Sequence, residues 1–376
     1  MKFFEEIFGA QSKKPVVGVD IGSHSIKVAE LKKPSLDKGK TAEIKPKPEI
    51  TAIGTAKLPA NAFQGAMPSK KEVIGDVLIE LLESKKIDTK RVAFSLPSSA
   101  VFTKKISLSK TAAENLEANI TFEASNYIPH RIDAINLDYY VLDDSGSSTT
   151  DVLLVAVKHE ILDTYRSIFE LAGLEPVIAD VESFAAYNCF ELSLSDALSA
   201  SREKTIALVD FGFRHSTITL IHKGLYLMSG DLAVGCKNYL EAIKSGLDVN
   251  QEQSEILLSG GVVPGTDTSI VGETIDKTTA HVVSELQRQI GFFWNGAGID
   301  SMVEEVWLLG GGVKVPRLKE EINSNLGMAC QTPDIISAFN ITEAANRALD
   351  ASDVPVYAVA LGLGLRRSSD KTLKDI

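Results

Sequence analysis

Short runs of apolar and β-branched residues alternate along the chain with longer segments in which apolar residues recur every three or four positions. Val16–Ile21 and Ser25–Leu31 are predicted strands joined by the tight turn Gly22-Ser23-His24, and Thr205–Phe211 and Ser216–Ile221 form a second pair of the same kind. Because strand-like and helix-like segments alternate, the pattern predicts α/β architecture.

Helices are predicted where apolar residues share one face of a 3.6-residue period. These segments are Ser69–Lys85, Thr111–Tyr127, Glu160–Ala172, Cys236–Gly246, Asn250–Ser259, Thr278–Asn295 and Pro316–Leu326. Further strands are predicted at Arg91–Leu96, Leu137–Leu142, Val152–Val157 and Val306–Leu309. Ser69 and Glu72 have the spacing of a capping box at the start of the first of these helices.

The middle of the chain has its own order of elements. From Arg91 to Ala172 the predicted order is strand, helix, strand, strand, helix, which is typical of a small ferredoxin-like sheet. The first residues, Met1–Gly9, place phenylalanine and isoleucine on one helical face and Glu5 and Glu6 on the other. We expect that face to contact the protein or a partner rather than lipid, because the glutamates disfavour an anionic surface.

An internal repeat is the most informative feature of the sequence. Val19-Asp20-Ile21-Gly22 recurs as Val209-Asp210-Phe211-Gly212, and each copy ends one strand and turns into another. The two copies lie near the start of each half of the chain. Such a duplicated unit can face its copy across a cleft and present two similar loops to one ligand.

The loops carry the chemistry of a phosphate site. Gly22 and Gly212 let backbone N–H groups approach phosphate oxygens closely. Ser23 and Ser25 add hydroxyl donors, and Lys27 adds a positive charge. The repeat makes this interpretation more specific than a single Asp-x-Gly-Ser turn, which strand connections also favour.

Asp20 and Asp210 would repel phosphate directly and are better explained as ligands of Mg²⁺ through water. A hydrolase with paired carboxylates is the competing explanation, but it would not need glycine and serine in both loops. Gly310-Gly311-Gly312 follows an apolar strand and precedes a helix. Three glycines there would let an adenine ring lie against bare backbone.

Composition narrows the class of protein. The 376 residues include 39 Lys and Arg against 50 Asp and Glu, a net charge of −11, which disfavours nucleic acid as the main partner. The three cysteines and six histidines have no metal-ligand spacing, so we expect neither zinc nor disulfides. We also expect no signal peptide and no membrane span, because no apolar run approaches about 20 residues.

Three motifs in this order resemble the actin, Hsp70 and sugar-kinase superfamily. They are Asp20–Lys27 as the first phosphate loop, Asp210–Thr217 as the second, and Leu308–Val313 as the adenosine motif. The second loop departs from the common Gly-Gly-Gly-Thr form, since Phe213 and Arg214 replace two glycines. Further on, Cys236 and Leu240 stand where relatives more often carry glycine and threonine.

A narrower resemblance covers nearly the whole chain. The chain is similar to the PilM family, actin-like proteins of type IV pilus assembly related to the division protein FtsA. The similarity rests on five segments, which are Val19–Leu31, Glu123–Pro129, Val155–Val157 with Leu171–Leu174, Asp180–Ala185 and Tyr357–Arg366.

The resemblance implies duplicated actin-like (ribonuclease-H-like) domains with four subdomains and a small ferredoxin-like insertion. The implied division has five parts. They are an N-terminal amphipathic segment (1–13), a first core (14–89 plus 176–200), an inserted partner-binding subdomain (90–175), a second core (201–235 plus 305–376) and a small lobe over the nucleotide (236–304).

The resemblance also implies ATP and Mg²⁺ as cofactors. The implied nucleotide-binding residues are Gly22, Ser23, His24, Ser25, Lys27, Gly212, Phe213, Arg214, His215, Ser216, Gly310, Gly311, Gly312 and Val313. Asp20 and Asp210 would organise Mg²⁺ through water, and Glu182 has the position of the residue that orients the attacking water. An exposed glutamate at a helix N-terminus remains the alternative for Glu182. At most a slow Mg²⁺-dependent ATPase is implied.

The implied partner is the cytoplasmic tail of PilN, a single-span inner-membrane protein, together with other components of the pilus machinery. The chain would then be cytoplasmic and peripheral to the inner membrane through that partner, and self-association stays open. Asn126 and Arg131, near Glu123–Pro129, are candidates for contact with the tail, although core packing also explains that motif.

Two alternatives share the same ATP site. A small-molecule kinase needs a polar substrate pocket with an aspartate base, and no separate loop with that chemistry is present. An FtsA-like division protein usually ends in an amphipathic membrane helix, whereas Ser368–Ile376 is short and charged.

Overall fold

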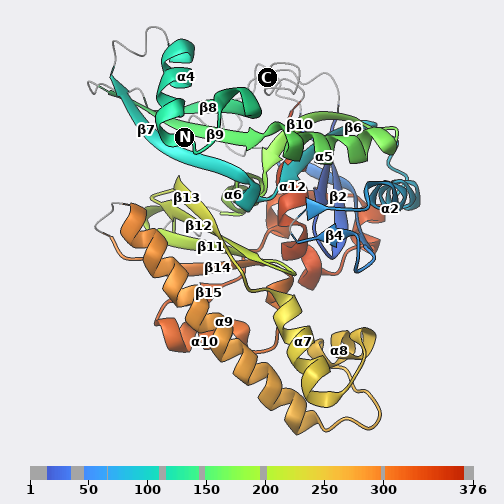
Figure 1. Cartoon of the computed structure of the whole chain (residues 1–376). Helices are drawn as coiled ribbons and strands as arrows, with labels where there is room; N and C mark the ends of the chain where they lie inside the picture. Colours follow the sequence, from blue (N-terminus) through green and yellow to red (C-terminus); the bar gives the residue numbers. More distant parts are fainter. Residues whose placement is uncertain are drawn as a thin grey trace.

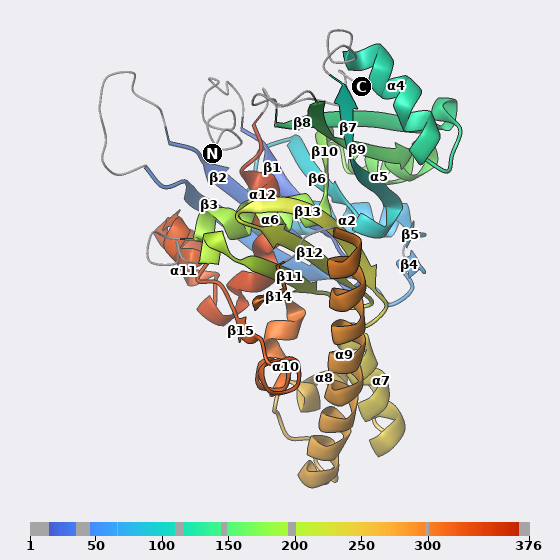
Figure 2. The same cartoon turned by 90° about the vertical axis from the view of Figure 1, so that its left-hand side faces the viewer.

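The computed structural model describes residues 15–34, 46–65, 67–109, 116–143, 149–194, 201–297 and 301–367. The amphipathic segment predicted at 1–13 lies outside them. Within these residues, two large mixed sheets and a smaller antiparallel sheet carry the fold, and helices pack on the faces of the large sheets (Figures 1 and 2).

The first large sheet has the strand order β10-β6-β1-β2-β3-β16. Its strands are β1 (Val17–Ile21), β2 (Ser25–Lys32), β3 (Glu49–Lys57), β6 (Arg91–Leu96), β10 (Glu175–Val181) and β16 (Asn340–Ile341). β1 pairs antiparallel with β2 and parallel with β6. Every residue of β1 is buried, as expected for a strand covered on both faces.

The second large sheet has the order β13-β12-β11-β14-β15. Its strands are β11 (Thr205–Phe211), β12 (Ser216–His222), β13 (Leu225–Leu232), β14 (Glu305–Gly310) and β15 (Ala329–Gln331). Neighbouring strands are antiparallel from β13 to β11 and parallel from β11 to β15. The strands β3-β2-β1-β6-β10 of the first sheet pair in the same way. The duplication predicted from the repeated Val-Asp-x-Gly motif is therefore present in the strand order.

Two helices, α6 (Glu182–Ser193) and α12 (Ala358–Gly364), lie between the large sheets (Figure 1). Their side chains share one core with both sheets, where the Phe190 and Trp307 rings lie 5.4 Å apart. The helices approach so closely at Gly362 that a Cβ there would lie 1.9 Å from the carbonyl oxygen of Ala185. These contacts join the two halves of the molecule below the loops that carry the repeated motif.

The other faces of the large sheets are covered by longer helices. α2 (Lys71–Ser84) and α5 (His159–Leu171) share a core with the first sheet. α7 (Cys236–Leu247), α9 (Thr268–Ala297) and α10 (Leu318–Leu326) do so for the second. α7, α8 (Gln251–Leu258) and the first turns of α9 form a small lobe that extends away from the sheet (Figure 1).

The inserted unit spans fewer residues than the strand pattern predicted. Its sheet has the order β7-β9-β8, with β7 (Val101–Ser109), β8 (Ile135–Asp143) and β9 (Thr149–Lys158) beside α4 (Leu116–Tyr127). Arg91–Leu96, predicted as the first strand of this unit, lies instead in the first large sheet as β6. The helix predicted to close the unit, α5, packs on α2 in the core of the first large sheet.

Short elements complete the fold. They are β4 (Phe63–Gln64), β5 (Met67–Pro68), α11 (Glu343–Arg347) and the 3₁₀ turns η1 (Ser98–Ala100), η2 (Ile132–Ala134), η4 (Gly311–Lys314), η5 (Ile336–Ala338) and η6 (Ala351–Tyr357). Within the described residues, no helix is both long enough and apolar enough to span a membrane.

The predicted helix positions are confirmed with two corrections, except that residues 111–115 of the helix predicted at Thr111–Tyr127 lie outside the described residues. The capping box at Ser69 is wrong, because α2 begins at Lys71 and the Ser69 hydroxyl donates to the carbonyl oxygen of Ala62. α9 begins ten residues before the predicted start at Thr278. Val271 and Ile275 extend its buried face, and this packing outweighs the weak helix propensity of the threonines and Gly272 there.

Candidate functional site

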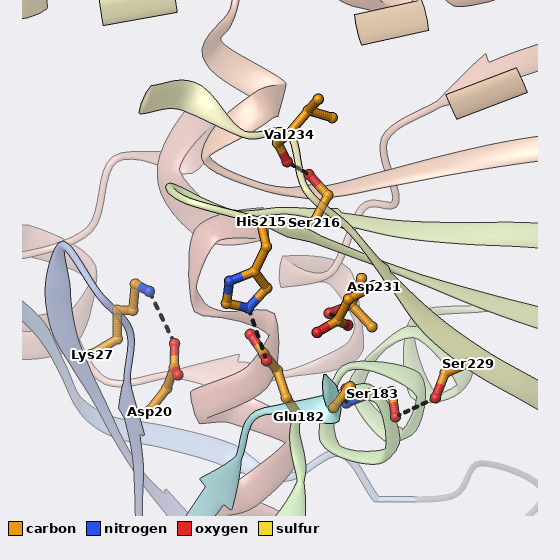
Figure 3. Close-up of polar contacts among 11 residues, drawn as sticks. Asp20, Lys27, Glu182, Ser183, His215, Ser216, Ser229, Asp231 and Val234 are labelled. Atoms are coloured by element: carbon orange, nitrogen blue, oxygen red, sulfur yellow. Dashed lines mark hydrogen bonds and ion pairs between the residues drawn. The ribbon is translucent and has the colours of Figure 1, made fainter. Parts of the chain in front are cut away.

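The turns after β1 and β11 meet above α6, at the join between the two halves. A small pocket lies there, lined by Asp20, Ile21, Gly22, Ser23, Phe63, Ser95, Pro97, Tyr165, Glu182, Arg214 and His215. The predicted site residues among them come from both repeated loops and from the start of α6 (Figure 3). Phe63, Ser95, Pro97 and Tyr165 are lining residues that the sequence analysis did not identify.

Lys27 is the central cation of the site. It pairs in register with Asp20 across the β1–β2 hairpin, and its Nζ donates to Asp20 Oδ2 at 2.9 Å (Figure 3). Burial lowers the pKa of Lys27, but the carboxylates of Asp20, Asp210 and Glu182 raise it further, so its pKa is raised overall. Lys27 therefore stays protonated and offsets the negative charge of both repeated aspartates.

Asp210 occupies the equivalent position at the end of β11. Burial raises its pKa, and the negative charges of Glu182 and Asp20 add to this effect. Of the two aspartates predicted to organise Mg²⁺, Asp20 is thus close enough for its charge to act on Asp210. Within the described residues, no group of three His, Cys, Asp or Glu side chains is arranged to hold a metal ion directly.

Glu182 is the first residue of α6 and forms an ion pair with His215. His215 Nε2 lies 3.9 Å from Glu182 Oε2 (Figure 3). The Glu182 carboxylate raises the pKa of His215 to about 9, against the opposing effect of burial. His215 is therefore protonated near neutral pH, and it balances the carboxylate predicted to orient a water molecule.

Within the described residues, two hydrogen-bond donors of the side chains that line the pocket have no protein partner. They are the hydroxyl of Tyr165 and the Nε of Arg214, and both atoms are buried. Arg214 is on the second loop and was predicted as a phosphate ligand. Tyr165 is on α5, where its position on the apolar face of an amphipathic helix indicates only core packing.

Among the described residues, two contacts near the repeated loops connect the halves. The rings of His24 and Phe213 stack with centroids 4.4 Å apart. Beside them, Lys57 Nζ at the end of β3 lies 2.6 Å from Glu255 Oε2 on α8 of the small lobe. Both members of this pair affect His24. Burial lowers the pKa of His24, Lys57 lowers it further, and Glu255 acts in the opposite direction.

The carbonyl groups of the second loop bind the N-terminus of α7. The N–H groups of Cys236 and Lys237 donate to the carbonyl oxygens of Gly212 and Phe213 at 3.0 and 2.8 Å. Gly235 permits this approach, since a Cβ there would lie 2.5 Å from the Phe213 carbonyl oxygen. This packing attaches the small lobe to the loop.

Ser216 and Ser25 differ in their surroundings. Ser216 is fully buried, and its hydroxyl donates to the carbonyl oxygen of Val234 (Figure 3). Ser25 begins β2, where its carbonyl oxygen accepts a hydrogen bond from the N–H of Gly22 and closes the first turn. The geometry therefore gives Ser216 an internal partner, although it was predicted as a nucleotide ligand.

The three glycines after β14 lie against the end of β11. A Cβ at Gly310 would lie 2.2 Å from Asp210 Oδ1, and one at Gly312 would lie 2.4 Å from the Phe211 Cβ. At Gly311 it would lie 3.3 Å from Cys236 Sγ. Gly310 and Gly312 are thus required by packing on the second loop. Val313 packs against the core of the second half.

The residues present fit a phosphate ligand with an associated cation. Lys27 and His215 supply positive charge, and the Tyr165 hydroxyl and Arg214 Nε supply donors without partners. Asp20 and Asp210 would hold the water shell of Mg²⁺, whose charge would offset that of the phosphates.

Asn126 and Arg131, the candidates for contact with a partner, lie at the surface of the inserted unit. Asn126 Nδ2 is 3.4 Å from Glu123 Oε2, and Arg131 forms an ion pair of 2.6 Å with Asp133. Phe122 and Tyr127 on the same helix are also exposed, by 69% and 42%. Ala124 and Ile128 of the same motif are buried in the core of this unit, as the packing alternative predicts.

Two sheets of matching topology, with two helices between them and the repeated loops above, define an actin-like fold, as predicted. The model for the type IV pilus assembly protein PilM family matches residues 18–368. The chain therefore belongs to this family.

Solved structures agree with the fold. The chain is similar to a structure described as a PilM-PilN type IV pilus biogenesis complex, with a TM-score of 0.77, 22% identity, and coverage of 93% of this chain and 98% of that one. It is also similar to the ethanolamine utilization protein EutJ from Carboxydothermus hydrogenoformans, with a TM-score of 0.53, 14% identity, and coverage of 96% and 93%.

Proposed function

We propose that this PilM family protein is an ATP–Mg²⁺-binding scaffold that binds the cytoplasmic tail of a PilN-like inner-membrane protein. It would thereby lie at the cytoplasmic face of the inner membrane and link that protein to other components of the pilus machinery. Family membership and the similarity to a PilM-PilN complex support the partner.

One observation carries the nucleotide part of the proposal. The repeated loops converge on a pocket lined by Asp20, the ion-pair partner of Lys27, and by two donors that have no partner among the described residues. In this arrangement the loops and Lys27 would hold the phosphates, and Glu182 would orient a water molecule near the terminal phosphate. Its ion pair with His215 weakens it as a base, which favours slow turnover.

We place the partner site on the inserted unit, because it has its own sheet and core outside the duplicated halves. Phe122 and Tyr127 supply exposed apolar surface, and Asn126 and Arg131 supply polar groups beside it. The topology favours a unit that begins with β7 and ends with β9, rather than one with the sequence-based limits of 90 and 175.

Isothermal titration with ATP and Mg²⁺ tests the nucleotide proposal. We expect saturable binding at a one-to-one ratio, and weaker binding of ATP–Mg²⁺ by Asp210→Ala. A heat signal indistinguishable from dilution, in protein shown to be folded by circular dichroism, would refute nucleotide binding.

A further inference from the structure

Tyr165 has an unusual environment for a buried tyrosine. The residue is 1% exposed and packs in the core of the first half, yet its hydroxyl has no hydrogen-bond partner in the part of the chain that the structure describes. In contrast, the hydroxyl of Tyr187 donates to the carbonyl oxygen of Gly224 at 2.7 Å, and that of Tyr239 to Thr279 Oγ1 at 3.2 Å. Buried hydroxyls are normally satisfied, so the exception indicates a partner supplied from outside the chain.

The same pocket contains a second donor of this kind, Arg214 Nε. Tyr165 belongs to the first half of the molecule and Arg214 to the second, and both residues line this pocket. Both groups donate hydrogen bonds, and a guanidinium carries a permanent positive charge, so an oxyanion is the ligand that suits them together.

The position of the pocket indicates which oxyanion. Gly310, Gly311 and Gly312, proposed to face adenine, do not line it, whereas Gly22 and Ser23 of the first loop and Glu182 do. The pocket is thus at the end of the nucleotide site away from the base. A nucleoside diphosphate bound through the loops would leave it without an anion, and a triphosphate would place its third phosphate there.

We propose that Tyr165 and Arg214 donate hydrogen bonds to the terminal phosphate of the bound nucleoside triphosphate, and that these bonds make the cleft prefer the triphosphate to the diphosphate. The inference rests on the proposed function. Because the donors come from different halves, the terminal phosphate would also tie the halves together, and its loss would release them.

Titration calorimetry with Mg²⁺ and either ADP or a non-hydrolysable ATP analogue tests this proposal. Tyr165→Phe removes only the hydroxyl, and we expect about tenfold weaker binding of the analogue with ADP affinity within about twofold of the parent. Its melting temperature should stay the same or rise, because no protein hydrogen bond is lost. Arg214→Gln should weaken binding of the analogue in the same way.

Tyr187→Phe is the matched control. It should lower the melting temperature, because the carbonyl of Gly224 loses its partner, and leave both affinities unchanged. If the parent binds both nucleotides and Tyr165→Phe keeps its preference for the triphosphate analogue, the inference is wrong. If the parent binds neither nucleotide, the proposed function itself fails, so the two failures are distinguishable.

Discussion

At the residue scale, Lys27 stabilises the most charged part of the cleft. Asp20 is only 5% exposed, and Lys27 is its ion-pair partner at 2.9 Å. A buried carboxylate without its cation is costly, because the protein interior cannot replace the solvation of the charge. The pair therefore contributes to folding whether or not a ligand is bound.

Lys27→Met should destabilise the protein by about 3 kcal/mol, since it keeps the volume of the side chain and leaves Asp20 buried without a partner. Urea unfolding measures the change. Lys57→Met is the control, because its ion pair with Glu255 involves a lysine side chain that is 70% exposed, and such pairs contribute roughly 0–1 kcal/mol. Equal losses in the two variants would contradict the account.

His215 makes a pH-dependent contribution to stability. Its pKa is raised from 6.5 to about 9 in the folded protein, so its stabilisation is fully present below pH 6.5 and is lost as the pH rises through about 9. At about 1.4 kcal/mol per pKa unit, reduced for partial exposure, the loss is on the order of 2 kcal/mol.

Urea unfolding at several pH values between 6 and 10 checks this prediction, with His215→Asn as the reference. The free energy of unfolding of the parent should fall by more over this range than that of the variant. Burial raises the pKa of Asp210 to about 7, so Asp210 loses its proton in the lower part of this range in both proteins. The test of His215 is therefore the difference between the two curves from pH 8 to 10. Parallel curves would show that the His215–Glu182 pair contributes nothing.

The sequence identified the charged site residues better than the neutral ones. Asp20 and Asp210 were recognisable because a repeated motif marks them, and Glu182 because it begins a helix with a family motif. Tyr165 carries no such signal, because a buried tyrosine on an amphipathic helix is ordinarily core. Only the three-dimensional structure shows that its hydroxyl has no partner among the residues described.

At the scale of elements, the sequence pattern did not predict β3, β7, β10 or β13, and β3 and β13 were missed for the same reason. β3 adds a third strand to the β1–β2 hairpin, and β13 adds one to the β11–β12 hairpin. Several residues of both strands are only half-buried. Polar and small residues such as Thr51, Gly54 and Ser229 weaken the alternation that marks a strand. Pairing with β2 and β12, a tertiary interaction, determines their conformation.

The Lys57–Glu255 ion pair connects β3 to the small lobe, and the His24–Phe213 stack connects the first loop to the second. We expect Glu255→Gln to release bound nucleotide faster by up to about fivefold. The substitution removes the ion pair with Lys57 between the two halves, and such a pair contributes roughly 0–1 kcal/mol. Stopped-flow displacement of a fluorescent ADP measures the rate.

Glu252→Gln, on the same helix, is the control, because Glu252 is exposed and forms no ion pair within the described residues. An unchanged release rate in Glu255→Gln, with an unchanged equilibrium affinity, would show that the bridge does not limit opening of the cleft.

At the scale of the whole molecule, the duplicated fold was predictable because the repeated motif and the family resemblance agree. The extent of the inserted unit was not, because a strand such as β6 has the same local pattern whether it pairs in the core sheet or in the insertion. Its pairing with β1 and β10, which are distant in sequence, is decided by long-range contacts.

The duplicated halves share one core through α6 and α12, while the proposed partner site lies on the inserted unit. β7 follows directly from β6 through η1, and β10 returns to the core sheet before Glu182 begins α6. The inserted unit is therefore connected to the cleft through short segments of the first half, which gives a physical route for coupling nucleotide and partner.

Calorimetric titration with a synthetic peptide of the cytoplasmic tail of the PilN-like protein tests the central claim most directly. The protein would be measured with ATP–Mg²⁺, without nucleotide, and as Asp210→Ala. The account predicts saturable one-to-one binding, and any difference in affinity among the three states measures the coupling to nucleotide. Absence of binding in all three, with folded protein and soluble peptide, would contradict the scaffold function.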